Sequence, residues 1–399
     1  MSKEGVNSNQ PLSGVKVLDF TQVMLGPCCT QVLGDYGADV IKIERIGSGD
    51  LSRWSLPDDP GGQMNPVFCS LNRNKRSIAL NLSGDAGKGV IRKLATTADV
   101  VVNNFRAGVM ERMGLGYKDL AAINPRIICA FGTGFGTKGP YAHKGGQDIL
   151  AQAMTGVMAR KCDPSEPTLV YPTALADYSA GMHLVQGILL ALLQRERTGK
   201  GQEVQVSLYD SMLSMQMQEA SMWLMRQRDF SWGAMPLSGA FPTTDGALVL
   251  VGAFKENPLR DICTALEIDD LSADPRFTPF ETLRAHRPEI QKIMADRFAS
   301  NTTAYWIARL ETQDLLCAPV KSLPEALGDG QTTANGMILD VPANDFGFGM
   351  VSTPVHMSED GFALRHLPPK LGQDGEIILT ENGFSAAEIA ALRQDRVLA

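Results

Sequence analysis

The chain has 399 residues, of which 44% are hydrophobic and 20% charged, and its formal net charge is -7. This composition is typical of a globular protein of two or three domains, and the acidic balance argues against nucleic acid as its main partner. The seven cysteines are scattered and form no CxxC pair or Cys/His cluster. They therefore argue against a disulfide framework and against a zinc site.

The apolar runs indicate neither a secretory signal nor a membrane span. Residues 1–10 are polar and are expected to form a loose tail. The longest apolar run, Leu184–Leu193, contains Gln186 and Gly187 and is too short to cross a bilayer. We therefore expect a cytoplasmic protein with reduced cysteines and no membrane partner.

In the first half of the chain, short apolar runs alternate with helical patterns. This alternation predicts an α/β fold, in which a parallel sheet carries helices on its faces. The expected strands are Val15–Phe20, Val40–Ile43, Ser77–Leu82, Asp99–Asn103, Arg126–Phe131 and Gln202–Ser207, and the expected helices are Pro27–Tyr36, Gly84–Ala98, Gly108–Ile123 and Asp177–Arg197.

The second half of the chain shows a different pattern of predicted elements. Leu208–Arg228 is predicted to be one long helix whose methionines mostly pack in a core. From Gly239 onward, short strands and helices indicate a second, smaller domain. After about Pro324 the chain becomes rich in glycine and proline, and it ends in a helix with a capping box at Ser385 and Glu388.

One glycine motif mimics a dinucleotide site. Gly134–Gly139 matches GxGxxG after a strand, but a dinucleotide fingerprint needs a helix to begin there. Pro140 and Tyr141 follow instead, so we expect a loop, and a nucleotide-dependent oxidoreductase is disfavoured. The histidines form no local pair of metal ligands, and His183, in an apolar helix, is expected to be a hydrogen-bonded core residue.

Asp177 is the most informative carboxylate, because it stands at the start of a long apolar helix. One reading is an N-cap, in which the carboxylate accepts free backbone N–H groups. The other is a nucleophile for covalent catalysis, kept ionised by the helix dipole and the same N–H groups. The residues alone leave both readings open.

The order of short motifs resembles the CaiB/BaiF (class III) family of CoA transferases. The similarity is clear from Pro11 to about Asp210 and fainter beyond. It rests on the following blocks: Pro11–Thr21, Gly26–Pro27, Gly37–Glu44, Gly47–Asp50, Asn72–Ile78, Asn104–Arg106, Arg112–Leu115, Asn124–Arg126, Gln152–Gly156, Leu175–His183 and Thr198–Gln202.

The resemblance implies a Rossmann-like large domain, a smaller α+β domain inserted into it, and an interlocked homodimer. The expected organisation is a tail at 1–10, a large CoA-binding domain at 11–207, a linker helix at 208–238, a small domain at 239–324 and a C-terminal return to the large domain at 325–399. The fold of this family binds CoA without a GxGxxG motif, which agrees with the reading of Gly134–Gly139 as a loop.

The resemblance also implies an activity, the transfer of CoA from an acyl-CoA to a small carboxylic acid. The nucleophilic aspartate of the family falls on Asp177, which would form an aspartyl anhydride and then an aspartyl-CoA thioester. CoA is a substrate here, and no prosthetic group or metal is expected. The CoA-contacting positions fall on Val23, Met24, Leu25, Arg45, Leu80, Asn104, Phe105, Arg112, Met113 and, within one residue, Lys144. Backbone N–H groups of the glycine-rich segment 132–146 are a candidate oxyanion site.

Two alternatives to transfer and one transfer substrate are disfavoured. Racemases of the same family use a histidine before the second acidic residue, but here Gln147 precedes Asp148, and glutamine is no acid or base. Asp148 is then expected to be a supporting carboxylate near Asp177. A catalytically silent CoA-binding protein would have lost Asp177. Oxalate is disfavoured as a substrate because Ser231–Gly252 lacks the glycine run of formyl-CoA:oxalate transferases.

Overall fold

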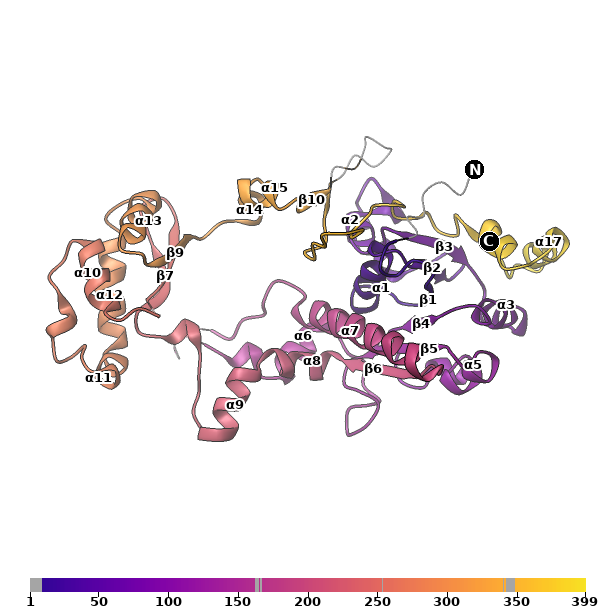
Figure 1. The fold of residues 1–399 in the computed structure, drawn as a ribbon, viewed down its shortest axis with the longest axis horizontal. Helices are drawn as coiled ribbons and strands as arrows, with labels where there is room; N and C mark the ends of the chain where they lie inside the picture. The colour runs from indigo at the N-terminus through magenta and orange to yellow at the C-terminus, as the bar shows by residue number, and fades with distance from the viewer. Residues whose placement is uncertain (1–8, 162–164, 166, 253, 340, 342–348) are drawn as a thin grey trace. The chain divides into compact units, whose positions relative to one another are not determined.

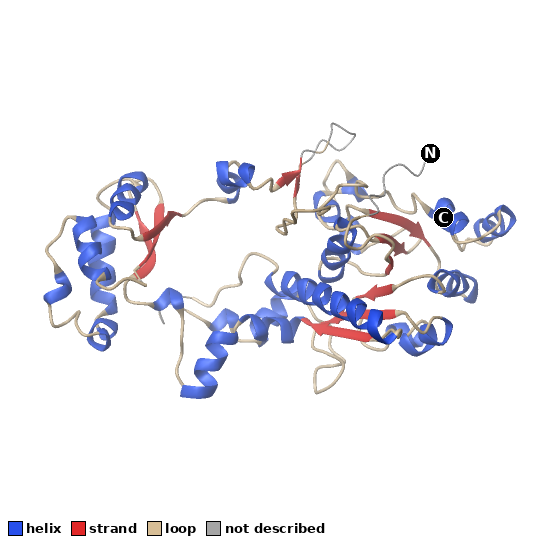
Figure 2. Cartoon of the chain, in the orientation of Figure 1, coloured by secondary structure: helices blue, strands red, loops and turns tan. Residues whose placement is uncertain are grey.

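Figures 1 and 2 show the computed structural model, which describes residues 9–161, 165, 167–252, 254–339, 341 and 349–399. The chain divides into two compact units. Unit 1 takes in the described parts of residues 1–158, 169–216 and 336–399, and unit 2 those of residues 159–168 and 217–335.

Unit 1 is built on a six-stranded sheet in the order β3-β2-β1-β4-β5-β6, and every neighbouring pair is parallel. The predicted α/β class with a parallel sheet is thereby confirmed, and the strand order is that of Rossmann folds. The strands are β1 (Lys16–Asp19), β2 (Asp39–Glu44), β3 (Lys75–Ala79), β4 (Val100–Asn103), β5 (Ile128–Thr133) and β6 (Glu203–Ser207).

Helices cover both faces of this sheet, and a short two-stranded sheet of β10 (Ile338–Leu339) and β11 (Met350–Val351) completes unit 1 (Figures 1 and 2). The α-helices of unit 1 are α1 (Leu25–Asp35), α2 (Pro66–Cys69), α3 (Asp85–Ala95), α4 (Val109–Arg112), α5 (Tyr117–Ile123), α6 (Asp148–Met154), α7 (Leu175–Thr198), α8 (Leu208–Met215), α16 (Gly375–Glu381) and α17 (Ala386–Gln394).

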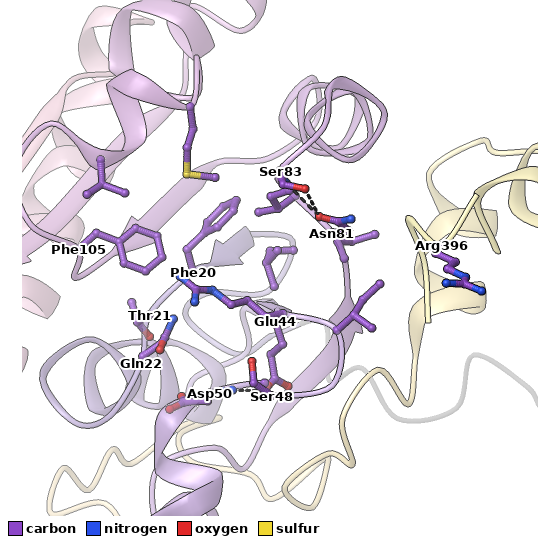
Figure 3. A pocket seen from close by; sticks show the side chains of 18 residues that line it. Phe20, Thr21, Gln22, Glu44, Ser48, Asp50, Asn81, Ser83, Phe105 and Arg396 are labelled. Atoms are coloured by element: carbon purple, nitrogen blue, oxygen red, sulfur yellow. Dashed lines mark hydrogen bonds between the residues drawn. The ribbon is translucent and has the colours of Figure 1, made fainter. Parts of the chain in front are cut away.

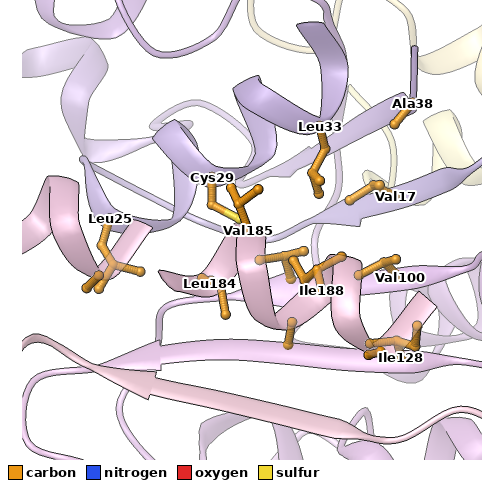
Figure 4. Packing of buried hydrophobic residues seen from close by; sticks show 14 of the residues in the cluster. Val17, Leu25, Cys29, Leu33, Ala38, Val100, Ile128, Leu184, Val185 and Ile188 are labelled. Atoms are coloured by element: carbon orange, nitrogen blue, oxygen red, sulfur yellow. The ribbon is translucent and has the colours of Figure 1, made fainter. Parts of the chain in front are cut away.

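Successive residues of a strand point alternately into two different hydrophobic cores. In β4, Val100 and Val102 point to one core and Val101 to the other, as the two-residue period of a strand requires. Helices α1 and α7 close the first core, where residues around Leu33 and Ile188 pack over the sheet (Figure 4). The second core lies under α3, α5, α16 and α17, so the C-terminal helices return to the sheet.

Unit 2 has its own core and its own sheet. The strands β7 (Ser238–Pro242), β8 (Ala247–Val251) and β9 (Leu316–Pro319) form an antiparallel sheet. Buried side chains of this sheet, among them Phe241 and Leu250, pack with residues of the surrounding helices. The α-helices of unit 2 are α9 (Met217–Arg226), α10 (Pro258–Leu266), α11 (Phe280–Ala285), α12 (Arg287–Phe298), α13 (Thr303–Thr312), α14 (Leu323–Leu327) and α15 (Gly330–Ala334).

Two predicted helices are interrupted. The helix expected over Gly108–Ile123 is divided into α4 and α5, and Gly114 between them has a φ of 68°, outside the helical region. The helix expected over Leu208–Arg228 breaks at Gln216, whose side-chain amide donates to Met212 O at 3.2 Å. That oxygen is the acceptor that the backbone N–H of Gln216 would use in a continuous α-helix.

The boundaries between the two units differ from the expected domain boundaries at two places. The expected linker 208–238 is divided at Gln216, so that 208–216 belongs to unit 1 and 217–238 to unit 2. Residues 325–335, expected in the returning segment, group with unit 2. Of the predicted core methionines, Met212 is buried, but Met215 is exposed.

Helix α7 is long and apolar enough to cross a bilayer by length and composition, the only such helix in the described ranges. The core helix of a soluble protein meets the same criteria. Ala180, Leu184 and Ile188 of α7 are fully buried in the first core of unit 1. The buried face of α7 is thus explained by packing within the chain.

Candidate active site

A cavity of about 620 Å³ lies at the carboxyl ends of β1, β2, β3 and β4 (Figure 3). In open parallel sheets, ligands bind at this edge, near the point where the strand order reverses, here between β1 and β4. Its lining residues are Phe20, Thr21, Gln22, Ile43, Glu44, Arg45, Ile46, Ser48, Gly49, Asp50, Leu80, Asn81, Leu82, Ser83, Phe105, Val109, Met113 and Arg396. A cavity of this size and mixed lining suits a cofactor-sized ligand.

Four of the CoA-contacting positions expected from the sequence line this cavity, namely Arg45, Leu80, Phe105 and Met113. Asn104 lies behind it and fixes the main chain of Gln22. The Asn104 side chain accepts the N–H of Gln22 at 2.9 Å and donates to its carbonyl oxygen at 2.7 Å.

Five further expected positions do not line the cavity. Val23, Met24 and Leu25 lie in the turn before α1 and at the start of that helix, beside the lining residue Gln22, whereas Arg112 and Lys144 lie elsewhere. Arg112 ends α4, and its guanidinium lies near Gly108 at the start of that helix. Lys144 is exposed, with its Nζ 4.5 Å from the centre of the Tyr141 ring. Neither residue lines the cavity in the described chain.

The turn between β1 and α1 has a strained conformation at Val23. This residue has a φ of 65°, which is unusual for a β-branched side chain. The N–H of Val23 donates to Asp50 Oδ1 at 3.0 Å, and Asp50 is buried. Backbone strain of this kind persists where surrounding contacts enforce it, and it concentrates at functional sites.

Buried ion pairs contact the backbone of this turn and of the start of α1. The carboxylates of Asp50 and Asp19 pair with Lys42 at 2.7 Å and with Lys75 at 3.1 Å, and the four side chains are fully buried. Lys42 Nζ also donates to the Thr21 carbonyl at 2.9 Å and Lys75 Nζ to that of Pro27 at 3.0 Å. No role was predicted for these residues from the sequence, although Lys42 stands between the apolar residues Ile41 and Ile43 of β2.

Asp177 is not the N-cap of α7, which corrects the first sequence-based reading. The cap residue is Ala174, and Asp177 is the third residue of the helix. The carboxylate of Asp148 takes the capping role, because its Oδ1 accepts the N–H groups of Ala176 at 2.6 Å and Asp177 at 3.0 Å. Asp148 and Asp177 are therefore neighbours.

The pKa of Asp177 is not lowered, as it would be if the helix dipole and the N–H groups dominated its surroundings. Burial, and secondarily the charge of Asp148, raise the pKa of Asp177 from 3.8 to about 6, while a backbone hydrogen bond from Leu25 acts in the opposite direction. The first-turn N–H groups cannot offset burial because Asp148 already uses them. At neutral pH Asp177 is still mostly ionised, and it is poorly solvated.

Close packing of α7 on α1 brings Asp177 to the strained turn. A Cβ at Gly181 would lie 2.2 Å from the Sγ of Cys28 and 2.8 Å from the carbonyl oxygen of Leu25. Only glycine permits this approach, one turn after Asp177 in α7. The carboxylate thus reaches the first residue of α1, next to the turn that borders the cavity.

The glycine-rich segment after β5 is a loop, as expected. Turns follow Gly134, and the next helix begins only at Asp148. Gly134 and Gly146 pack against each other so closely that a Cβ on Gly134 would lie 2.4 Å from the Cα of Gly146. The N–H of Gly136 donates to Thr133 Oγ1 at 2.9 Å, so this group is not free for an oxyanion.

Two further observations concern the other titratable groups of the described chain. His183 Nδ1 is 3.0 Å from Ser211 Oγ, which agrees with the expected hydrogen bond, but His183 is half-buried and is not the core residue that was expected. Within the described ranges, His, Cys, Asp and Glu form no group of three or more that could hold a metal ion.

Together, these features describe a Rossmann-like α/β unit with a cavity at the carboxyl edge of its sheet, the edge where such folds bind ligands, and with a partly buried carboxylate nearby. A family model for CoA-transferase family III matches residues 12–375. The chain belongs to this family and is a CoA transferase, as its sequence motifs indicated.

Individual proteins agree with this assignment. The chain is 36% identical to a mouse succinyl-CoA:glutarate CoA-transferase, over 94% of this chain and 87% of the relative. It is 34% identical to an Escherichia coli formyl-CoA:oxalate CoA-transferase, over 97% and 99% of the two chains. A crystal structure of a CaiB/BaiF family protein from Brucella suis is similar with a TM-score of 0.83 and 31% identity, over 94% of this chain and 100% of that one.

Proposed function

We propose that the protein moves CoA from an acyl-CoA to a free organic acid through covalent intermediates on Asp177. The observation that carries this proposal is the placement of Asp177. Its carboxylate has a pKa of about 6 and accepts a backbone hydrogen bond from Leu25, beside the turn that borders a cavity of about 620 Å³.

The proposed reaction begins when a carboxylate oxygen of Asp177 attacks the acyl carbonyl carbon. The C–S bond breaks, CoA leaves as a thiolate, and a mixed anhydride remains on Asp177. The thiolate then attacks the aspartyl carbonyl and releases the donor acid, which leaves an aspartyl-CoA thioester. The acceptor carboxylate attacks this thioester and displaces the CoA thiolate, which leaves a second anhydride on Asp177. The thiolate then attacks the acceptor acyl carbonyl of this anhydride, so that the new acyl-CoA forms and the Asp177 carboxylate is released.

The environment of Asp177 supports this role. A carboxylate with a raised pKa is a better nucleophile than a fully solvated one, and it remains mostly ionised at neutral pH. Retention of the thiolate in the cavity gives it a high effective concentration for its return. Arg45 is suited to the phosphates and Phe105 to the adenine of CoA.

Racemisation has less support. Gln147, at the position where the racemases carry histidine, is exposed, and its side chain makes no cap hydrogen bond at α6. A glutamine cannot exchange the proton that a racemase must remove and return. A silent CoA-binding protein would have no need of a partly buried carboxylate with a raised pKa at position 177.

We infer that one of the two acids is a dicarboxylate, because the names of several relatives include succinyl-CoA, glutarate, malate or oxalate. The test is a panel of acyl-CoA and acid pairs, with the products separated by mass spectrometry. Formation of the acceptor acyl-CoA in step with loss of the donor supports transfer. Hydrolysis alone, or epimerisation of a 2-methylacyl-CoA, would contradict the proposal.

Asp148→Asn is expected to shift the pH profile of transfer. In the wild type, kcat/KM should fall as the pH drops through about 6, because Asp177 then becomes protonated. Removal of the Asp148 charge lowers the pKa of Asp177, and we expect the acid limb to move down by roughly half a unit to one unit. Burial, which is the larger cause of the raised pKa, keeps the pKa of Asp177 above 3.8 in this variant.

The control for this shift is Asp210→Asn. Asp210 is the third residue of α8, as Asp177 is of α7, and it is exposed. An acid limb that stays in place in Asp148→Asn, or that moves equally in the control, would show that the Asp148 charge does not act on Asp177.

We further propose that the protein is an interlocked homodimer in the cytoplasm. Large apolar side chains are exposed in both units, including Leu190 at 67% on α7 and Leu224 at 78% on α9. Exposed patches of this kind are typical of protein interfaces. The free thiols of the described cysteines suit a reducing compartment.

Interlocked chains should not separate on dilution while they remain folded. Sedimentation at nanomolar concentration is therefore expected to show a dimer up to the onset of unfolding. A folded monomer at that concentration would rule out the threaded arrangement.

A further inference from the structure

Two of the four charged side chains that line the cavity have no counter-charge. Glu44 accepts two hydrogen bonds of 2.8 Å from Arg53, and Asp50 pairs with Lys42 at 2.7 Å. Arg53 and Lys42 do not line the cavity, so the charges of Glu44 and Asp50 are neutralised by residues outside the cavity. The two remaining lining charges are Arg45 and Arg396, neither of which has an ion-pair partner in the described chain. The cavity therefore favours a ligand with several negative charges.

Arg396 reaches the cavity from the far end of the chain. After α17, the segment of residues 397–399 runs beside the end of β3, where Asn81 N–H donates to Val397 O at 2.9 Å and Leu398 bridges to Leu80. Val397 and Leu398 are buried, so this segment is fixed while Arg396 is exposed. Figure 3 shows Arg396 on the opposite side of the cavity from Thr21 and Gln22.

The backbone of Arg396 is in a conformation that favours glycine. Its φ is 56°, in the left-handed region, where the chain leaves α17. The N–H groups of Val397 and Leu398 both donate to Leu392 O, at 2.8 and 3.1 Å, which closes the end of the helix. Glycine usually occupies such a position, and a residue kept there despite the penalty suggests a function for its side chain.

We propose that Arg396 binds the 3′-phosphate of CoA. CoA carries a pyrophosphate and a separate 3′-phosphate at its nucleotide end, while its thioester end must reach Asp177. Arg45, on the loop after β2, is suited to the pyrophosphate. Arg396, on the side away from the turn before α1, is suited to the terminal phosphate, next to the polar lining residues Asn81 and Ser83. This inference rests on the proposed function, because it takes CoA as the ligand of the cavity.

The test compares an acyl-CoA with the corresponding acyl-3′-dephospho-CoA. In Arg396→Gly, we expect the KM for the acyl-CoA to rise about 10- to 100-fold, the range for a hydrogen bond to a charged group, with kcat nearly unchanged. The KM for the dephospho substrate should stay near the wild-type value. Glycine relieves the strain of the positive φ, so the melting temperature of Arg396→Gly should not fall. Arg396→Gln removes the same positive charge but retains a polar side chain.

The matched control is Arg393→Gln. Arg393 belongs to the same C-terminal helix, pairs with Glu376 at 2.8 Å and does not line the cavity. Both KM values should be unchanged in this variant. Equal losses with the two substrates in Arg396→Gly, or a wild type that does not distinguish them, would overturn the assignment. Calorimetric titration with CoA distinguishes failure of this inference from failure of the proposed function. If the wild type does not bind CoA, both are overturned. If wild type and Arg396→Gly bind CoA equally, only this inference is overturned.

Discussion

Asp177→Asn is expected to lower CoA transfer by several orders of magnitude, with CoA binding largely retained. An amide is a very weak nucleophile toward a thioester, so neither the anhydride nor the aspartyl-CoA thioester can form at a useful rate. Because asparagine has nearly the shape of aspartate, the cavity and the turn before α1 should be unchanged. The loss should therefore appear in kcat rather than in the dissociation constant of CoA.

The same variant should be at least as stable as the wild type at neutral pH. Burial raises the pKa of Asp177 in the folded protein from 3.8 to about 6, so the folded state binds the proton more tightly than the unfolded chain does. The wild type then loses stability as the pH rises from about 4 to about 6, on the order of 3 kcal/mol in total. Asparagine carries no charge and avoids this loss.

The readouts are single-turnover rates and melting temperatures of Asp177→Asn and of the control Asp210→Asn. Near-normal transfer by Asp177→Asn would mean that another residue is the nucleophile. A large drop in its melting temperature, shared by the control, would instead indicate a structural role for acidic residues in the first turn of these helices.

Lys75→Met is expected to destabilise unit 1 strongly. Lys75 and Asp19 are fully buried, and their ion pair is 3.1 Å long. Removal of one partner leaves an unpaired buried carboxylate, which typically lowers the free energy of unfolding by about 3–5 kcal/mol. The loss should appear as a lower denaturation midpoint, and the double variant Asp19→Asn/Lys75→Met should recover part of it.

Lys118→Met is the control for this change, because Lys118 is exposed on α5 in the same unit. A surface substitution of this kind should change the free energy of unfolding by less than about 0.5 kcal/mol. Similar midpoints for Lys75→Met and the control would show that the buried charge pair contributes little to stability.

The sheet could be predicted because its strands are buried on both faces, and short apolar runs such as Val100–Val102 stand out between helical patterns. The breaks at Gly114 and Gln216 could not, because they depend on local hydrogen bonds and on a single left-handed residue. The family motifs pointed to Asp177 as the candidate nucleophile. Its raised pKa could not be predicted, since it arises from burial and from Asp148, which lies 29 residues away in the sequence.

Other parts of the site are invisible to sequence patterns for similar reasons. Lys42 and Asp50 look like ordinary charged residues until the fold buries them under the turn at Val23. Arg396 lies in the last turn of the chain and reaches the cavity only because residues 397–399 run beside β3. In each case, contacts between segments that are distant in the sequence place the side chain at or near the cavity.

The covalent role of Asp177 is tested most directly by trapping the enzyme during turnover. Wild-type protein is incubated with an acyl-CoA and hydroxylamine, and every peptide is then mapped by mass spectrometry. The account predicts a hydroxamate at Asp177 alone, dependent on the acyl-CoA and absent from Asp177→Asn. An enzyme that transfers CoA while Asp177 stays unmodified, or that carries the hydroxamate on another carboxylate, would contradict it.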